Sequence, residues 1–223
     1  KIQQDALQSI LDNNGSGILA LATGTGKTKI GIDYCILKKK ENSKVKTPEK
    51  LLDIYFNSVG RNGVLLLNIP PDKEGLINDS DIAALKKWKQ LRDNIFKKNF
   101  AKNAILESSN GINAGLILDN NDATHFTTTG NDTTAIIEIQ LKTKATFNVL
   151  QLQENIRMGQ RIEKFALEYW DGKTWIMAAQ GTSIGFKRLL KFSTVKAVKL
   201  RLKILSSRLN PCLAEFGLFF MKV

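Results

Sequence analysis

The sequence predicts a mixed α and β chain that ends in an antiparallel β-sandwich, and two observations support this fold class. Beyond residue 105, apolar and polar side chains alternate over residues 137–141, 165–169 and 198–204, which is the period of strands with one solvated face. Before residue 105, short apolar runs stand between stretches of helical period, which is typical of α/β units. The prediction divides the chain into residues 1–46, 47–104 and 105–223.

The composition is that of a globular chain. Of the 223 residues, 43% are hydrophobic and 24% are charged, which excludes a disordered, collagen-like or coiled-coil chain. No apolar run reaches the roughly 18–20 residues of a membrane helix, so we expect no membrane segment. The 33 basic and 21 acidic residues give a net charge of +12, which admits a nucleic-acid partner without establishing one. Cys35 and Cys212 stand far apart and are expected to be buried thiols rather than a disulfide or zinc site.

Residues 1–46 are expected to form a helix, a short strand, a loop and a second helix that runs into a basic linker. The loop, residues 22–28, reads Ala-Thr-Gly-Thr-Gly-Lys-Thr, and a strand followed by a helix is the context of a phosphate-binding P-loop. Backbone N–H groups at Gly24 and Gly26 would surround a polyphosphate, Lys27 would reach its outer oxygens, and Thr28 would ligate magnesium. Leu21 stands where the strict pattern has its first glycine.

The same loop resembles motif I of superfamily-two helicases and of type I restriction motor subunits. Residues 1–6 are similar to the glutamine motif of that group, which implies that Gln4 reads adenine. The resemblance implies ATP, magnesium and nucleic acid as partners, but an ATPase also needs an acidic motif, and the chain contains no Asp-Glu dipeptide. We therefore interpret residues 1–46 as an isolated start of such a domain, and we keep ATP and nucleic-acid binding as the alternative function.

Residues 47–104 are expected to form one α/β unit. Thr47, Pro48 and Glu49 predict a helix start, with a hydroxyl cap, a proline in the first turn and an acid near the helix N-terminus. The apolar run at residues 64–69 predicts a buried strand that Pro70 ends. A second helix is expected over residues 81–104, with Ser80 as its cap.

Residues 51–75 closely resemble the end of the catalytic barrel in bacterial alpha-L-fucosidases. The resemblance implies a (β/α)₈-like barrel that removes terminal fucose with retention, through an aspartate nucleophile and a carboxylic acid/base, in an exported or periplasmic protein. A complete barrel needs about 250 residues, so residues 47–104 would be its closing unit only. Arg61 and Asn68 could face the sugar in an intact barrel, although structural roles are also open to them.

No residue here matches the nucleophile of that family, so we assign no catalytic residue and expect no fucoside turnover by this chain alone. The available acids are interpreted as helix caps and solvated surface: Asp53, Asp72, Glu74, Asp79 and Asp81. No secretory signal opens the chain, and a helicase-like start followed by a fucosidase-like remainder is interpreted as a fusion or a recombined reading frame.

Residues 105–223 are similar to the discoidin-type, galactose-binding-like domain that often follows the barrel, through residues 118–126, 168–175 and 210–218. Related domains often hold a structural calcium, which implies a site made of Asp119, Asp122, Thr124 and Glu215 and suits the oxygen ligands that calcium takes. The alternative is an ordinary Asx turn beside an unrelated strand acid. No cofactor is otherwise required.

Trp170 and Trp175 bracket an Asp-Gly turn, so a carbohydrate-binding role is open to them, as is a place in the core. Three functions follow. The first is the C-terminal part of an alpha-L-fucosidase, with fucosylated glycans or other carbohydrate as partners. The second is a carbohydrate-binding module that works alone, and the third is the ATP- and nucleic-acid-binding alternative.

Overall fold

The computed structural model describes residues 45–72 and 74–222. Of these, residues 49–66 and 88–222 form one compact unit, and the remaining described residues before position 88 belong to a second. The predicted P-loop and adenine-reading residues lie outside the described residues: Gln4, Gly24, Gly26, Lys27 and Thr28. In the described part of the chain, no helix is long and apolar enough to cross a membrane.

The larger unit is built on two 20-residue antiparallel strands, β4 (Ala135–Glu154) and β7 (Arg188–Ser207). The sheet order is β1-β4-β7-β5-β6, and β8 pairs with the second half of β4. The other members are β1 (Ile105–Ser108), β5 (Ile162–Trp170), β6 (Trp175–Gly181) and β8 (Leu213–Phe219). The short strands β2 (Gly111–Ile112) and β3 (Thr127–Thr128) pair with each other, and two 3₁₀ turns, η1 (Ala114–Leu118) and η2 (Ile156–Met158), complete the unit.

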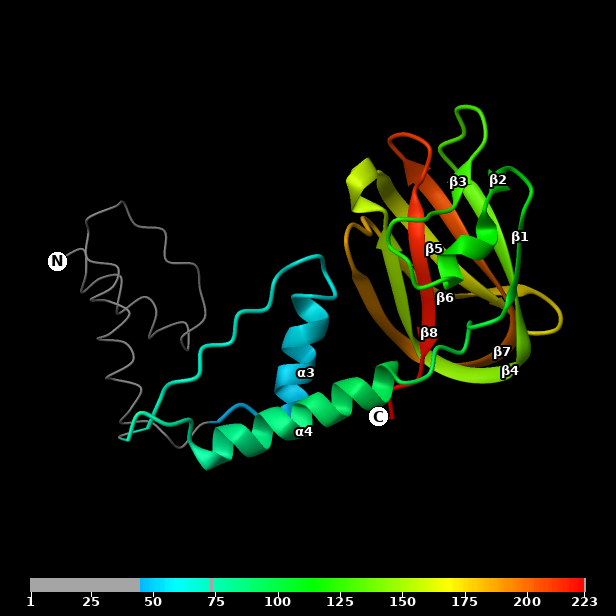
Figure 1. Cartoon of the computed structure of the whole chain (residues 1–223). Coiled ribbons are helices and arrows are strands. Elements are labelled where there is room, and N and C mark those ends of the chain that lie inside the picture. The colour runs from blue at the N-terminus through cyan, green and yellow to red at the C-terminus, as the bar shows by residue number, and fades with distance from the viewer. Residues whose placement is uncertain (1–44, 73, 223) are drawn as a thin grey trace, which may run out of the picture. The chain divides into compact units, whose positions relative to one another are not determined.

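The long strands bend because their pairing is interrupted. The β4–β7 register shifts between Gln140 and Ala145 and again between Phe147 and Val149, and such irregularities increase local twist and bend a strand. Figure 1 shows the resulting curvature, by which the sheet folds over itself around one core. That core holds fully buried aromatic rings, among them Phe126, Phe147 and Phe216.

The predicted strands are confirmed, with one local difference. In β4, Ile137, Ile139 and Leu141 are buried while the residues between them are exposed, as the alternation predicts. In β5, the predicted solvated residue Glu168 is buried instead. Its carboxylate is paired with two cations, as described below, and burial of a paired charge is tolerated.

Two helices contribute to this unit. Helix α3 (Pro48–Asn57) begins at the proline, as predicted. Helix α4 (Asp79–Phe96) is capped by Asn78, whose Oδ1 accepts a hydrogen bond from the Ser80 backbone N–H at 2.9 Å, so the predicted cap is wrong by two residues.

An aromatic cluster joins α3 and the second half of α4 to the sandwich. It consists of Leu52, Tyr55, Phe56, Trp88, Leu91, Ile95, Phe96, Val149, Leu189, Phe219 and Met221. The Phe96 and Phe219 ring centroids are 5.0 Å apart in an edge-on arrangement, and such pairs add stability beyond the apolar area that they bury. Helix α3 and the second half of α4 therefore pack against the sandwich.

Two predictions for the segment before the sandwich are wrong. The apolar run at residues 64–69 forms no strand, and Val64 and Leu66 are 93% and 91% exposed, because no described strand pairs with it. The second helix ends at Phe96 rather than at residue 104. There the chain turns toward β8: Asn99 Oδ1 accepts hydrogen bonds from the backbone N–H groups of Ala101 and Leu218, at 2.9 and 3.0 Å.

A buried carboxylate holds together the loops at one end of the sandwich. Glu154, 2% exposed, accepts three backbone hydrogen bonds, from Arg161 and Ile162 at 2.7 and 2.8 Å and from Gly185 at 2.7 Å. The first two donors lie before and at the start of β5, and the third lies in the β6–β7 loop. One side chain thus fixes two loops that are separate in sequence.

We expect Glu154→Ala to lower the free energy of unfolding by about 3 kcal/mol or more, because each of three N–H groups loses an acceptor at about 1–3 kcal/mol. Glu154→Gln should cost less, since one oxygen remains. Urea unfolding measures both, with the exposed strand variant Glu107→Ala as the control, expected within about 0.5 kcal/mol of the parent. A Glu154→Ala loss no larger than that of the control would contradict this role.

Candidate functional site

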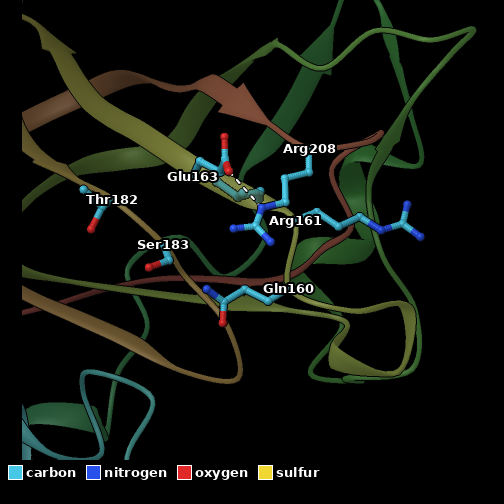
Figure 2. A pocket seen from close by; sticks show the side chains of 7 residues that line it. Gln160, Arg161, Glu163, Thr182, Ser183 and Arg208 are labelled. Atoms are coloured by element: carbon cyan, nitrogen blue, oxygen red, sulfur yellow. Dashed lines mark hydrogen bonds and ion pairs between the residues drawn. The ribbon is translucent and has the colours of Figure 1, made fainter.

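The loops that Glu154 fixes enclose a polar pocket of about 340 Å³ at one end of the sandwich (Figure 2). It lies where the start of β5, the β6–β7 loop and the residue after β7 come together. Its lining residues are Gln160, Arg161, Ile162, Glu163, Thr182, Ser183 and Arg208. No aromatic side chain is among them.

A carboxylate and a guanidinium stand side by side in this pocket. Arg208 Nε donates to Glu163 Oε1 at 2.9 Å, and Ser206 Oγ donates to the other carboxylate oxygen at 3.1 Å. The Arg208 hydrogen bond, followed by that of Ser206, lowers the pKa of the Glu163 carboxyl, so this group is ionised at neutral pH. Figure 2 shows the Arg208 guanidinium turned toward Glu163, on the side where Ser183 and Gln160 lie.

Arg161 has a structural role. Its Nε donates to the Met158 carbonyl and its Nη1 to the Asn210 carbonyl, both at 3.0 Å. Figure 2 shows its guanidinium pointing away from the other labelled side chains. Arg161 thus ties η2 to the loop before β8 and leaves the pocket to Arg208.

The pocket therefore offers hydrogen-bond donors and acceptors in close proximity. The ionised Glu163 accepts hydrogen bonds only, the Arg208 guanidinium donates only, and the Thr182 and Ser183 hydroxyls and the Gln160 amide do both. A ligand with several neighbouring hydroxyl groups matches that arrangement, because each hydroxyl also donates and accepts. A purely apolar ligand does not.

The tryptophan hairpin forms a second polar and aromatic surface. Trp170 and Trp175 are cross-strand partners, with ring centroids 5.4 Å apart and edge-on. Trp170 is 37% exposed, and Trp175 is half-buried, so neither ring lies in the core. The Arg201 guanidinium lies 4.4 Å from the Trp175 ring centroid, so a cation from β7 already covers that ring.

The basic face of β7 is partly neutralised by acids of neighbouring strands. Lys199 Nζ lies 3.0 Å from a Glu138 carboxylate oxygen, and Arg201 and Lys203 both pair with Glu168. The predicted basic strand face is therefore a row of ion pairs, and it gives no support to a nucleic-acid groove.

The predicted calcium residues come together only in part. Thr124 Oγ1 donates to Asp119 Oδ2 at 2.7 Å, and Glu215 is close enough to Asp119 and Asp122 for their charges to raise its pKa. Asp122 is exposed, and its Oδ1 lies 4.0 Å from Arg157 Nη2. Among the described residues, no group of three or more His, Cys, Asp and Glu side chains is arranged to hold a metal.

Glu215 is the unusual member of this cluster. Its Oε1 is buried and has no hydrogen-bond partner in the described part of the chain. Burial, and after it the charge of Asp119, raise the pKa of the Glu215 carboxyl to about 7. A cation or a proton would compensate such a group.

The other predicted positions have structural roles. Asp53 is an exposed residue in the middle of α3 and pairs with Lys191 of β7 at 2.6 Å, so it joins helix to sheet rather than capping the helix. Asp72 Oδ1 accepts backbone hydrogen bonds from Glu74 and Leu76 and so stabilises a turn. Cys212 is a buried free thiol, as predicted, and burial raises its pKa. Apart from these positions, the one histidine of the sequence, His125, has its Nδ1 3.1 Å from Asn155 Nδ2.

Sequence reasoning did not identify the pocket. Its residues come from three segments whose strand alternation gives no sign of convergence. The one available signal was Glu154, an acid at the end of an otherwise alternating strand, where burial needs an explanation.

Two known protein families match different parts of the chain. Residues 101–216 match the F5/8 type C domain family, and residues 26–91 match the alpha-L-fucosidase family. The second match begins at Gly26, so it includes Lys27 and Thr28 of the predicted phosphate loop. These matches support the fucosidase and discoidin resemblances and give no support to the helicase resemblance.

Individual relatives match about four fifths of the chain. A protein of Oryza sativa subsp. japonica assigned as alpha-L-fucosidase 1 is 37% identical over 187 residues, which cover 80% of this chain and 36% of the relative. A solved structure from Bacteroides thetaiotaomicron, assigned as an alpha-L-fucosidase, is 35% identical with a TM-score of 0.77, over 82% of this chain and 42% of that one. A GH29 fucosidase from Ruminococcus gnavus, solved in complex with fucose, is 31% identical with a TM-score of 0.74, over 79% of this chain and 37% of that one. The chain thus spans about two fifths of such a protein.

We expect the raised pKa of Glu215 to make stability depend on pH in calcium-free buffer. Between pH 4.5 and about 7, the folded state holds a proton that the unfolded chain has released, so the free energy of unfolding falls as pH rises through this window. A fully buried group would give about 1.4 kcal/mol per pKa unit, or roughly 3.4 kcal/mol over the shift from 4.5 to about 7. Solvent screens a half-buried group, so we expect a fall of roughly 1–2 kcal/mol. Urea unfolding at several pH values should show this slope in the parent and in Glu107→Gln, and a flatter one in Glu215→Gln. An unchanged slope in Glu215→Gln would contradict the assignment.

Proposed function

The chain belongs to the F5/8 type C domain family through residues 101–216, and from that premise we propose that its sandwich binds carbohydrate as the C-terminal part of an alpha-L-fucosidase. The single observation that carries this proposal is the polar pocket with its Glu163–Arg208 pair. The similarity to fucosidases over about four fifths of the chain supports the same conclusion. The Ruminococcus gnavus relative was solved with fucose, so fucosylated glycans are the first ligands to test.

The pocket is preferred to the tryptophan hairpin as the binding site. Trp175 is covered by Arg201, and a sugar stacking there would have to displace a cation that lies 4.4 Å from the ring centroid. Trp170 keeps an exposed edge and remains the second candidate. The two sites are distinguished by the variants described below.

Three parts of the sequence-based interpretation stay expectations. Residues 22–28 lie outside the described residues, and the similarities above do not favour ATP or nucleic-acid binding by them. We propose that this chain alone does not hydrolyse fucosides, since no catalytic carboxylate is assigned to it. Export of the protein is implied only by the resemblance to bacterial fucosidases.

Calcium is proposed as a structural cofactor near Glu215. The orphaned Glu215 Oε1, the Asp119 carboxylate and the Thr124 hydroxyl are the oxygens that would hold it, and calcium also takes backbone carbonyl oxygens. Such a set needs only two carboxylates, so it is compatible with the lack of an acidic trio among the described residues. Asp122, exposed and paired with Arg157, is the weakest member of the predicted set.

We expect fucosyllactose or methyl galactoside to bind the protein, and Arg208→Ala to weaken that binding at least tenfold, because both the guanidinium and the orientation of Glu163 are lost. Titration calorimetry or chemical shifts measure the affinity. Trp170→Ala tests the hairpin, and Lys164→Ala serves as a surface control expected to bind as the parent does. Binding that survives Arg208→Ala but is lost in Trp170→Ala would move the site to the hairpin, and a lack of binding by any sugar would refute the proposal.

We expect calcium to raise the melting temperature by several degrees at pH 8 and by less at pH 5, where Glu215 is protonated and a cation must displace that proton. Differential scanning fluorimetry with calcium and with chelator measures the shift. Glu215→Gln should abolish it and Glu107→Gln should retain it. A melting temperature that is the same with calcium and with chelator would leave the alternative, an Asx turn beside an unrelated acid.

A further inference from the structure

Two arginines face each other where the segment after α3 meets the start of β7. Arg61 and Arg188 form an isolated antiparallel bridge. Around it, the Leu189 N–H donates to the Gly60 carbonyl at 2.9 Å and the Asn62 N–H donates to the Lys187 carbonyl at 3.1 Å. Directly opposed residues of an antiparallel pair place their side chains on the same face, so this backbone register brings two guanidinium groups together.

This arrangement is unfavourable as it stands. Like charges directly opposite each other destabilise a strand pair. Arg188 Nε is also buried without a hydrogen-bond partner, and burial followed by the charge of Arg61 lowers the pKa of that guanidinium. Within the described part of the chain, neither arginine pairs with an acid.

A carboxylate relieves the repulsion. Its two oxygens accept hydrogen bonds from guanidinium groups in a planar, bidentate arrangement, and its charge offsets the repulsion between the two arginines. A protein with a net charge of +12 also attracts an anionic ligand toward such a site. The pair is therefore suited to an anion with planar oxygen geometry.

The arginine pair is linked to the polar pocket. Asn62 Nδ2 donates to Gln160 Oε1 at 3.4 Å, and Gln160 lines the pocket. Asn62 Oδ1 also accepts from the Phe186 N–H at 2.7 Å, which connects it to the β6–β7 loop that carries Thr182 and Ser183. The pair and the pocket thus flank the same loop.

We propose that Arg61 and Arg188 bind the carboxylate of an acidic sugar, a uronic acid unit, in a glycan that the sandwich recognises. This inference rests on the proposed carbohydrate binding and adds to it a preference for anionic glycans. The carboxylate of an acidic polypeptide is the competing occupant, and the experiment distinguishes the two.

The test compares methyl galacturonide with methyl galactoside at constant low ionic strength. The two sugars differ only at C6, where the first has a carboxylate and the second a hydroxymethyl group. We expect the galacturonide to bind at least fivefold more tightly, by titration calorimetry. Arg61→Gln and Arg188→Gln should reduce its affinity to that of the galactoside and leave galactoside binding unchanged. Lys196→Gln, which removes an exposed lysine elsewhere on β7, should keep the preference.

Stability gives a second measurement in case Arg188→Gln folds poorly. Arg61→Gln, at an exposed position, should raise the melting temperature of the ligand-free protein, because it removes the repulsion, and should abolish the additional shift caused by galacturonide. A lower melting temperature in Arg61→Gln would count against the proposed repulsion.

Four results would overturn the inference. Equal affinity for the two sugars would do so while leaving the proposed carbohydrate binding intact, whereas a lack of binding by either sugar would refute both. A sulfate-induced shift as large as that of galacturonide would indicate a general anion site. Tighter binding by an oligo-aspartate peptide that competes with galacturonide would assign the pair to an acidic polypeptide.

Discussion

The antiparallel pairing of β4 with β7 is the constraint on which the rest of this structure depends. Each strand is long enough to belong to both layers of the sandwich, so the bends at their register shifts decide where β5, β6 and β8 can pair. The same bends determine where the strands end and their connecting loops begin. Glu154 is the last residue of β4, and its carboxylate fixes the loops at one end of the sandwich. The pocket follows from this arrangement, because its walls are the loops that the buried Glu154 carboxylate holds in place.

Charge is distributed according to the same geometry. On β7, every second residue lies on the solvated face of the sheet, and acids of β4 and β5 on the same face pair with Lys199, Arg201 and Lys203. At the start of β7, Arg188 faces Arg61, and in the described part of the chain neither of these two arginines pairs with an acid. The ion pairs on β7 thus neutralise part of the positive charge, and a local excess remains beside the pocket.

Much of the sandwich could be predicted from the sequence, and the reasons are local. Alternation of period two identifies β4, β5 and β7 because one face of each is buried, and a proline after a hydroxyl residue identifies the start of α3. The failures concern residues whose environment is decided by distant partners. Glu168 is buried by cations from another strand, the segment at residues 64–69 lacks a described partner strand, and the chain after Phe96 turns because Asn99 bonds to β8. The pocket was not predicted for the same reason, since its residues meet only through tertiary structure.

The aromatic cluster of α3, α4 and the sheet has a consequence for how such a domain can be inherited. A module moves between proteins by gene rearrangement most easily when its own residues cover all of its apolar surface. Here Phe219 and Val149 of the sandwich are covered by Phe56 and Phe96 from the preceding helices. A rearrangement that cut the chain at the first strand would expose the Phe219 and Val149 side chains to water. We therefore expect the sandwich to be inherited together with the two helices before it.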